Sequence, residues 1–421
     1  MILVSANVSI LTIGDELILG DRIDTNGPWL SRAMLSCGIK TVERRCVSDG
    51  IENIVEALQA VVGKSDVCIL TGGLGPTEDD RTRKALAKAL GEPLVEDEKA
   101  LASIENWFSN AGLNMPSPNS VQALRPVSAT WIENKHGTAP GLIASIENCI
   151  VLCLPGPPSE LMPMFESVKS QVTEQLDCAA PMHTVELHAW GIAESIAGEK
   201  IKDLMQVDDP SVSILMGSAG ITARVTSSDE QKRNAVAKEI ECRWSPWVFG
   251  FENETLSSSL GKLVDGSIAI AESCTAGLVG DLIASTPGSS AWLSGGWITY
   301  SDALKCSQLG VGKALLEEFG AVSSEVAKAM CEGAAKISGA TIGLSTTGIA
   351  GPSGGTELKP VGTVFIGCTF NGETQVRAFR FTGNRNEIRM RAANTALQMV
   401  RLLLVGEESD RMCWQHGGTE R

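Results

Sequence analysis

Short apolar runs alternate with amphipathic stretches along the first third of the chain. The segments at residues 8–13, 41–47, 67–70 and 149–154 predict strands, the first of them buried. Helical periodicities predict helices at 24–35, 52–62 and 77–90, stopped in the first and last cases by Gly38 and Gly91. This alternation is typical of an α/β domain with a doubly wound, mostly parallel sheet. Ligands of such sheets bind beyond the carboxyl ends of the strands.

The pattern changes near residue 172. Strands at 185–190 and 221–225 and helices at 194–204 and 231–243 predict a small α+β unit, and Gly217-Ser218-Ala219-Gly220 resembles the GxxG loop of KH domains. The loop lacks flanking Lys or Arg, so it is either a weak nucleic-acid contact or a turn in a spacer domain. From Thr255 onward the pattern again predicts an α/β domain, with strands at 267–271, 297–300, 341–345, 361–369 and 376–381 and helices at 278–284, 325–338 and 387–404.

Chain length and these changes of pattern predict several domains. We expect boundaries at 1–170, 171–252 and 255–410, followed by a polar tail at 411–421 that frays after Gly406. In the third domain, Ser323 and Asn384 are predicted helix N-caps.

Charge and cysteine content narrow the class of protein. The 421 residues carry 35 Lys and Arg against 50 Asp and Glu, a net charge of −15 that opposes non-specific binding to nucleic acid or anionic lipid. The 12 cysteines form no CxxC pair, and the 4 histidines have no zinc spacing. There is no basic segment ahead of Arg22 and no apolar run long enough to span a membrane. We therefore expect a cytoplasmic enzyme that contacts neither membrane nor nucleic acid.

A turn of small residues at 271–277 carries the most chemistry. It joins a predicted strand to a predicted helix, so its backbone N–H groups form a candidate anion site beside a candidate nucleophile, Ser273 or Cys274. The second half of the chain has a single histidine, His416, in the polar tail, so the base must be another residue, and Lys305 is the natural candidate. Cys274 has no histidine to activate it, and we favour Ser273.

A second candidate site follows the predicted strand at 67–70. Gly72, Gly73 and Gly75 let the backbone approach an anion, and a helix starting near Thr77 would point its positive end there. Asp79 and Asp80 would repel a bare phosphate but suit a divalent cation between carboxylate and pyrophosphate oxygens. The alternative is structural, because Thr77 and Asp80 also have the spacing of a capping box.

These N-terminal strings resemble a known fold. Gly14-Asp15-Glu16-Leu17, Asp24-Thr25-Asn26, Ser48-Asp49, the 71–80 string, Asn134 with Gly137, and Leu154-Pro155-Gly156 are similar to the molybdopterin-binding fold as it occurs at the N-terminus of the CinA family. The resemblance implies metal-dependent hydrolysis of ADP-ribose to AMP and ribose 5-phosphate. Asp49 and Asp80 match the key aspartates of that fold. We expect metal ligands at Asp15, Glu16, Asp79 and Asp80, and substrate contacts at Asn26, Asp49, Gly72, Gly73, Gly75, Pro155 and Gly156.

The third domain resembles the C-terminal CinA domain, whose single-domain relatives deamidate nicotinamide mononucleotide (NMN). The matching strings lie at 271–275, 300–305, 345–352, 359–362 and 383–389, although the family usually has glycine where this chain has Ala276. Ser273 would attack the carboxamide, Lys305 would take the serine proton, and Tyr300 would relay a proton or donate a hydrogen bond. Contacts with phosphate and ribose are expected from Glu272, Thr275, Ala276, Gly277, Thr347, Gly348, Gly351, Arg385 and Arg389. For Glu272, capping a turn is the alternative.

Together these features predict a bifunctional pyridine-nucleotide hydrolase that acts on NMN and ADP-ribose. The N-terminal domain would need a divalent metal ion, the C-terminal domain no cofactor, and the chain is expected to form a homodimer. Two alternatives stay open. In the first, the protein is a non-catalytic nucleotide- or pterin-binding protein with a role in competence or DNA damage. In the second, only one of its two sites is active.

Overall fold

The computed structural model describes residues 6–217, 220–409 and 412–415. It divides into two compact units, Met1–His183 and Thr184–Arg421, which are treated separately below. Within the described residues, no helix is both long enough and apolar enough to cross a membrane.

The first unit is built on a mixed six-stranded sheet in the order β2-β1-β3-β8-β7-β6. Four neighbouring strands, β2 (Lys40–Val47), β1 (Asn7–Ile13), β3 (Val67–Thr71) and β8 (Cys149–Leu154), run parallel. The next strand, β7 (Gly141–Ile146), runs antiparallel to β8, and the edge strand β6 (Thr130–Ile132) runs antiparallel to β7. The predicted strands of this domain and its mostly parallel sheet are thereby confirmed. The carboxyl ends of the four parallel strands meet at one edge of the sheet, which is where their loops form a cavity.

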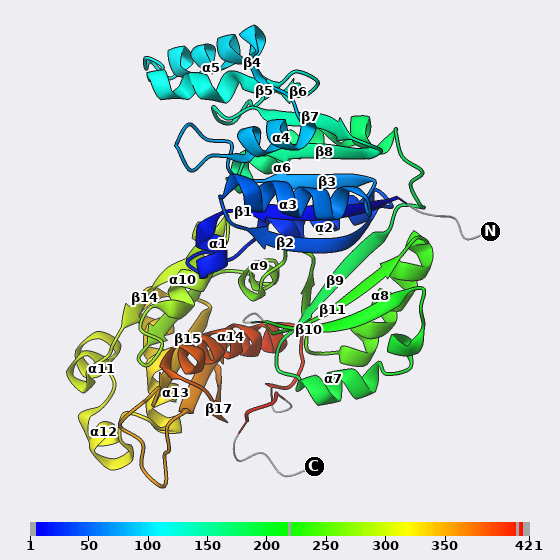
Figure 1. Cartoon of the computed structure of the whole chain (residues 1–421). Helices are drawn as coiled ribbons and strands as arrows, with labels where there is room; N and C mark the ends of the chain where they lie inside the picture. The colour runs from blue at the N-terminus through cyan, green and yellow to red at the C-terminus, as the bar shows by residue number, and fades with distance from the viewer. Residues whose placement is uncertain (1–5, 218–219, 410–411, 416–421) are drawn as a thin grey trace. The chain divides into compact units, whose positions relative to one another are not determined.

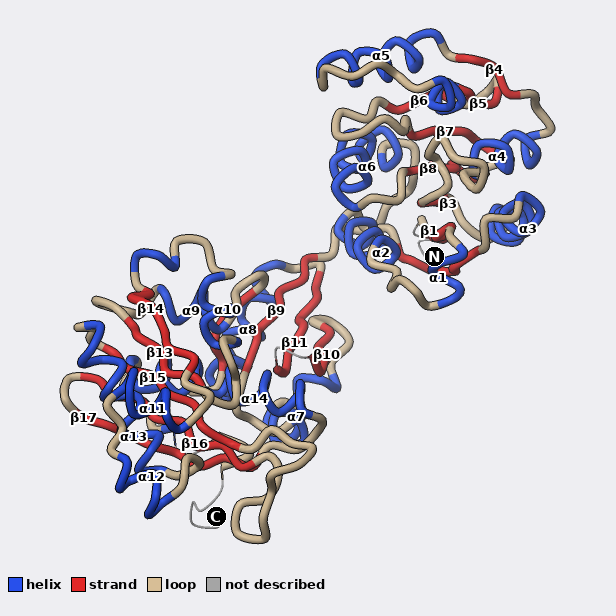
Figure 2. Tube along the Cα trace, turned by 90° about the vertical axis from the view of Figure 1, so that its left-hand side faces the viewer, coloured by secondary structure: helices blue, strands red, loops and turns tan. Residues whose placement is uncertain are grey.

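Alternating side chains of these strands enter two separate cores. In β1, Ile10 belongs to the core under α2 (Asn26–Ser36) and α6 (Pro158–Thr173), whereas Leu11 belongs to the core under α3 (Ile51–Val62) and α4 (Thr82–Leu90). Figure 2 shows the same arrangement, with β1, β3 and β8 stacked between α2 and α6 on one side and α3 and α4 on the other. Helices on both faces explain why β1, β3 and β8 are nearly continuous apolar runs, whereas β2 at the edge of the sheet carries exposed polar side chains.

The sequence analysis missed the elements between residues 91 and 146. This stretch forms β4 (Leu94–Glu96), α5 (Glu98–Asn110), a 3-10 turn η1 (Ser117–Ala123) and β5 (Leu124–Pro126) before β6 and β7. In Figures 1 and 2, α5 with β4 and β5 lies beyond β6, at the end of the unit away from β2. A short helix, α1 (Asp15–Leu19), follows β1.

The second unit begins with a four-stranded antiparallel sheet in the order β10-β11-β9-β12. The sequence indicated β9 (His183–Ala189), β11 (Gly220–Ser227), α7 (Glu194–Lys200) and α8 (Glu230–Trp244) but missed β10 (Ser211–Gly217), η2 (Leu204–Gln206) and β12 (Val248–Phe251). The predicted helix at 194–204 ends four residues early, at Lys200. Of the GxxG loop, Ser218 and Ala219 lie outside the described residues.

The rest of the second unit surrounds a five-stranded sheet in the order β14-β13-β15-β16-β17. Its strands are β14 (Leu293–Ile298), β13 (Ile268–Glu272), β15 (Ile342–Gly348), β16 (Thr363–Phe370) and β17 (Glu373–Arg380). Its helices are α9 (Leu256–Gly261), α10 (Leu278–Ala284), η3 (Ser289–Ala291), α11 (Asp302–Leu309), α12 (Lys313–Phe319), α13 (Ser324–Ser338) and α14 (Arg385–Leu404). Strands β13, β14 and β15 are parallel, so the residues that follow them meet at one edge.

The sequence located four of the five strands and the helices α10, α13 and α14, but it missed α9, α11 and α12. Ser323 and Asn384 are helix N-caps as predicted, the latter in a capping box with Glu387. The strand predicted at 297–300 ends at Ile298, because the chain turns there towards α11. The fraying expected after Gly406 does not hold for residues 412–415. Met412 is buried, and the backbone N–H of Arg380 in β17 donates to the carbonyl of Trp414.

Candidate active sites

A cavity of about 620 Å³ lies at the carboxyl edge of the first sheet. Its walls are the loops after β1, β2, β3 and β8, and they contain most of the predicted N-terminal site residues. The lining residues include Gly14, Glu16, Asn26, Asp49, Gly72, Gly73, Gly75, Asp79, Asp80, Pro155, Gly156 and Glu160. Parallel strands thus gather side chains that are far apart in the sequence.

The loop after β3 is stabilised by hydrogen bonds with Asp80 and Arg83, and no helix begins at Thr77. The helix predicted from Thr77 starts at Thr82, because Asp80 closes a separate turn in which its carboxylate accepts hydrogen bonds from the backbone N–H and the hydroxyl of Thr77, at 2.9 and 2.5 Å. Beneath the loop, the buried Arg83 donates to the carbonyls of Leu74 and Gly75, and burial lowers its pKa to about 10. The expectation that a helix at Thr77 directs its dipole at the cavity was therefore wrong.

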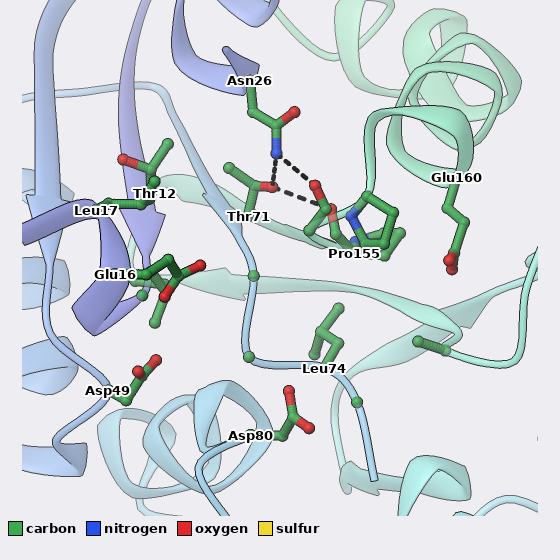
Figure 3. Close-up of a pocket in the computed structure, with 18 of the residues that line it drawn as sticks. Thr12, Glu16, Leu17, Asn26, Asp49, Thr71, Leu74, Asp80, Pro155 and Glu160 are labelled. Carbon is green, nitrogen blue, oxygen red and sulfur yellow. Dashed lines mark hydrogen bonds between the residues drawn. The ribbon is translucent and has the colours of Figure 1, made fainter. Parts of the chain in front are cut away.

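The carboxylates of the cavity are spread around its wall. Figure 3 shows Glu16, Asp49 and Asp80 on one side of it and Glu160 apart from them. The carboxylates of Asp15 and Asp49 each accept a hydrogen bond from the other residue's backbone N–H, at 3.2 and 3.0 Å. Burial raises the pKa of Asp49. No three His, Cys, Asp or Glu side chains of the described residues form a group that could hold a metal ion, so Asp15, Glu16, Asp79 and Asp80 are not a ready-made set of ligands.

The donor set still suits one kind of cation. Magnesium is usually held by one or two carboxylates, with water and substrate phosphate completing its shell. Glu16, Asp79 and Asp80 line the cavity with Asp49, and Arg22 is the one Lys or Arg among its described lining residues. An anionic ligand would meet mainly negative charge there, which a bound cation would offset.

Asn26 has a structural task in this site. Its amide nitrogen donates to the hydroxyl of Thr71 at 3.1 Å and to the carbonyl of Gly156 at 2.7 Å, and Thr71 donates in turn to the carbonyl of Pro155. These bonds join the start of α2 to the loops after β3 and β8 (Figure 3). Asn26 therefore fixes the shape of the wall on which Pro155 and Gly156 lie.

The second unit brings Ser273 and Lys305 together. Ser273 follows β13, Lys305 lies on α11, and Lys305 Nζ is 3.2 Å from Ser273 Oγ. Lys305 is only 1% exposed, and its Nζ also donates to the carbonyls of Thr299 at 3.0 Å and Tyr300 at 3.4 Å. Burial lowers the pKa of Lys305, although Asp302 at 3.8 Å opposes this effect. An amine that loses its proton readily beside a serine hydroxyl can act as its base.

Cys274 lies in a different environment. Its side chain is buried in the apolar core with Ile270 and Val279, and burial raises the pKa of its thiol to about 12. A thiol with that pKa stays protonated near neutral pH, and it is the thiolate that reacts. The geometry thus favours Ser273 over Cys274.

The turn at 273–277 does not offer the anion site that its sequence indicates. The buried carboxylate of Glu272 accepts hydrogen bonds from the backbone N–H groups of Gly277, Val279 and Gly280, at 2.9 to 3.1 Å. The start of α10 therefore already holds a negative charge from within the protein. Of the two roles considered for Glu272, the structure displays the capping one.

Ala276 adopts a backbone conformation that favours glycine. Its φ is +50°, in the left-handed region, where a Cβ atom costs about 1–2 kcal/mol. Gly277 follows with φ +94°. The departure from the usual glycine at position 276 therefore adds local strain next to Ser273, while the turn keeps its shape.

The remaining predicted residues of this site fall into two groups. Arg385 donates to the carbonyl of Gly351 at 2.6 Å and to the hydroxyl of Tyr300 at 3.0 Å, and Arg389 donates to the carbonyl of Thr275 at 2.7 Å, so all of these lie around the Ser273 turn. The second group consists of the side chains of Thr275 and Thr347, which are buried and form hydrogen bonds within the protein. Thr275 shares a hydrogen bond with Thr346, and Thr347 donates to the carbonyl of Ala321. Gly348 ends β15 and is partly exposed.

Known proteins similar to this chain show the family to which it belongs. A "Putative competence-damage inducible protein" from Caldicellulosiruptor saccharolyticus is 36% identical over 406 residues, 94% of this chain and 98% of the relative. A "CinA-like protein" from Dictyoglomus thermophilum is 37% identical over 402 residues, 93% of this chain and 98% of the relative. The chain belongs to the CinA family.

Family matches follow the order of the CinA domains. The probable molybdopterin binding domain matches residues 9–175, the damage-inducible protein CinA KH domain matches 184–250, and the CinA C-terminal domain matches 253–404. The predicted fold class, an N-terminal molybdopterin-binding-like domain followed by a small KH-like domain and a C-terminal CinA domain, is confirmed. A solved structure of "the protein CinA with unknown function" from Thermoplasma acidophilum is 32% identical and covers 40% of this chain and 98% of its own, with a TM-score of 0.38.

Sequence reasoning missed two residues of the N-terminal CinA site. Arg83 reads as an ordinary helix residue, and only its burial under the glycine loop reveals its task. Glu160 lines the cavity from the first turn of α6. Its position four residues after Gly156, the end of a string that sequence analysis did single out, was the available signal.

Proposed function

We propose that the C-terminal site hydrolyses the carboxamide of NMN to give nicotinic acid mononucleotide and ammonia. The observation that carries the proposal is the buried Lys305 ammonium 3.2 Å from the Ser273 hydroxyl. A serine activated by a neighbouring lysine is a known solution for breaking amide-like bonds without histidine. The coarser conclusion, a CinA-family protein, rests on the comparisons above.

In the proposed reaction Lys305 acts first as base and then as acid. A neutral amine has two hydrogens, which point to the carbonyls of Thr299 and Tyr300, and one lone pair, which is left for the proton of Ser273. Ser273 Oγ attacks the carboxamide carbon, and the proton held by Lys305 passes to the departing nitrogen, which leaves as ammonia. Water then attacks the acyl-serine while Lys305 takes a proton from it, and Lys305 passes this proton to Ser273 Oγ as the acid is released, which restores the free serine and the neutral amine. Arg385 and Arg389, which donate to the carbonyls of Gly351 and Thr275, would be the partners for the phosphate.

Ammonia release from NMN tests this proposal. Purified protein should turn NMN over, and Ser273→Ala and Lys305→Ala should each lower the rate at least about 100-fold. Lys313→Ala, a lysine on the neighbouring helix α12, is the matched control and should keep the wild-type rate. Turnover that survives in Ser273→Ala would refute the role of the serine.

We further propose that the N-terminal cavity hydrolyses ADP-ribose to AMP and ribose 5-phosphate. The supporting observation is the combination of glycines at 72, 73 and 75 with Glu16, Asp49 and Asp80 around one cavity of about 620 Å³. A bound divalent cation would neutralise the pyrophosphate and make water a stronger nucleophile. The chain's own glycine loop holds the phosphates close to the backbone, and its carboxylates would hold the cation.

The corresponding assay is AMP release from ADP-ribose with magnesium or manganese. Asp80→Asn should lower the rate at least about 100-fold, whereas Asp66→Asn, an aspartate at the opposite end of β3, should leave it unchanged. Equal rates in Asp80→Asn and wild type would contradict the assignment. The alternative of a non-catalytic nucleotide-binding protein predicts binding of both nucleotides with no product from either.

The proposed partners are these small nucleotides and a second copy of the chain. We propose a cytoplasmic homodimer that does not bind nucleic acid. Light scattering coupled to size exclusion should give about twice the monomer mass of 44.5 kDa. A mass equal to the monomer would overturn the dimer.

A further inference from the structure

Glu160 is a carboxylate of the N-terminal cavity that the proposed hydrolysis does not use. It lies in the first turn of α6, directly after the prolines that follow β8. Its side chain lines the cavity, and Figure 3 shows it apart from Glu16, Asp49 and Asp80. Glu160 therefore faces a different part of a ligand from the three carboxylates that are proposed to hold the cation.

The Glu160 carboxylate is held in one place by the loop before β7. The buried Asn134 donates from its amide nitrogen to Glu160 Oε2 at 2.7 Å and to the carbonyl of Ala139 at 2.9 Å. Gly137 packs so closely on the carboxylate that a Cβ atom there would overlap it. Partial burial also raises the pKa of Glu160. A fixed, half-buried carboxylate is a preorganised hydrogen-bond acceptor.

The chemistry of the expected ligand says what this acceptor would bind. If the pyrophosphate lies over the glycine loop beside Asp80, a sugar extends from each of its ends. A ribose presents neighbouring hydroxyl donors, and an acidic residue that accepts from them is how many nucleotide sites recognise a sugar. A carboxylate would repel a phosphate in the same place.

We propose that Glu160 accepts a hydrogen bond from a ribose hydroxyl of the nucleotide bound in this cavity and so selects an unmodified sugar. This inference rests on the proposed nucleotide hydrolysis and assigns Glu160 to binding, not to bond cleavage. It makes Asn134 and Gly137 positioning residues that act through Glu160.

The test is calorimetric binding of the methylene-bridged analogue of ADP-ribose, which cannot be cleaved, in the presence of magnesium. Glu160→Gln should weaken binding about 10-fold, because the amide oxygen of the new side chain takes the hydrogen bond from Asn134 and its NH2 group, which cannot accept, is left for the ligand. Removing the recognised hydroxyl, tested with analogues deoxygenated on either sugar, should weaken binding to wild type about 10-fold but to Glu160→Gln less than about 2-fold. Glu166→Gln, further along α6 and paired with Lys169, is the matched control and should bind like wild type.

Each other outcome has a separate meaning. The role of Glu160 would be overturned if Glu160→Gln bound the analogue with wild-type affinity. It would also be overturned if removing the sugar hydroxyl weakened binding to Glu160→Gln by the same factor as binding to wild type. An inosine analogue, which lacks the adenine amino group, tests the other end of the ligand. If the effect of Glu160→Gln on affinity depended on that amino group, the partner of Glu160 would not be the sugar. If wild type binds the analogue but never hydrolyses ADP-ribose, the proposed reaction fails while the binding cycle still decides on Glu160. Absence of binding in wild type would overturn both. Gly137→Ala keeps the charge but displaces the carboxylate, so it should reproduce the loss in Glu160→Gln.

Discussion

Lys305 Nζ lies 3.2 Å from Ser273 Oγ although the two residues come from different elements, the turn after β13 and helix α11. The lysine is almost fully buried, so its charge is destabilised in the place where a neutral amine is useful. The relationship leads to a pH dependence that can be measured in two ways.

The first prediction concerns the rate. Because burial lowers the pKa of Lys305 below its ordinary 10.5, kcat/KM for NMN should rise with pH and level off below pH 10.5. Lys305→Arg stays charged throughout and should remain inactive at every pH. A rate that is flat from pH 6 to 10 would argue against a titrating lysine.

The second prediction concerns stability. The folded state binds the Lys305 proton less tightly than the unfolded state, so the charged lysine lowers the free energy of unfolding at neutral pH. This destabilisation disappears as the pH rises through the lowered pKa towards 10.5. Lys305→Met should therefore gain more stability over wild type at pH 7 than at pH 10, measured by urea unfolding at both values. An equal stability difference between Lys305→Met and wild type at the two pH values would show that the charge of the buried amine does not destabilise the folded state.

The third prediction separates the two candidate nucleophiles. Cys274, with a thiol pKa of about 12, should resist alkylation at pH 8, whereas the exposed Cys46 and Cys242 should react. Cys274→Ala should keep NMN turnover within about 10-fold of wild type, well above Ser273→Ala. Mass spectrometry of the alkylated peptides gives the first result. Rapid labelling of Cys274 coupled to loss of activity would reverse the assignment.

The fourth prediction concerns Ala276. Replacing it with glycine removes the Cβ from a left-handed backbone and should stabilise the protein by about 1 kcal/mol. Ala329→Gly, within helix α13, should destabilise it by about 0.5–1 kcal/mol instead. Chemical denaturation of the two variants compares the signs directly, and a loss of stability in Ala276→Gly would mean that the turn is relaxed around alanine.

The fifth prediction uses one activity as the control for the other. A chelator should abolish ADP-ribose hydrolysis and leave NMN deamidation unchanged, because the proposed cation site lies in the cavity of the first unit and the proposed serine and lysine chemistry needs no metal. Added magnesium should restore the lost activity. Loss of both activities on chelation would indicate unfolding or a metal in the second site.

The sequence predicted those parts of the fold that local patterns determine. Apolar runs located β1, β3 and β8, and the capping box of Asn384 and Glu387 located the start of α14. The start of α4 was placed wrongly, because Thr77 and Asp80 have capping spacing but use it to close an independent turn.

The sites were predictable as strings of residues but not in their internal arrangement. Ser273 and Lys305 were paired by reasoning about which base the chain could supply, and the structure brings them together. The same reasoning expected free backbone donors at the start of α10, and these are taken by Glu272, whose side chain folds back onto the helix that follows it. Glu160 was missed because the residue that holds it, Asn134, lies 26 positions away.

The packing of Trp190 indicates how the chain can be divided for experiment. This residue, just after β9, belongs with Phe249 to the same apolar core as α14, and its indole nitrogen donates to Thr395 at 3.0 Å. An expression fragment cut near residue 252 would strip that core of two aromatic side chains and expose a helix face prone to aggregation. A fragment that begins at Thr184 keeps the core intact, so the C-terminal CinA domain should be produced with the small antiparallel sheet attached.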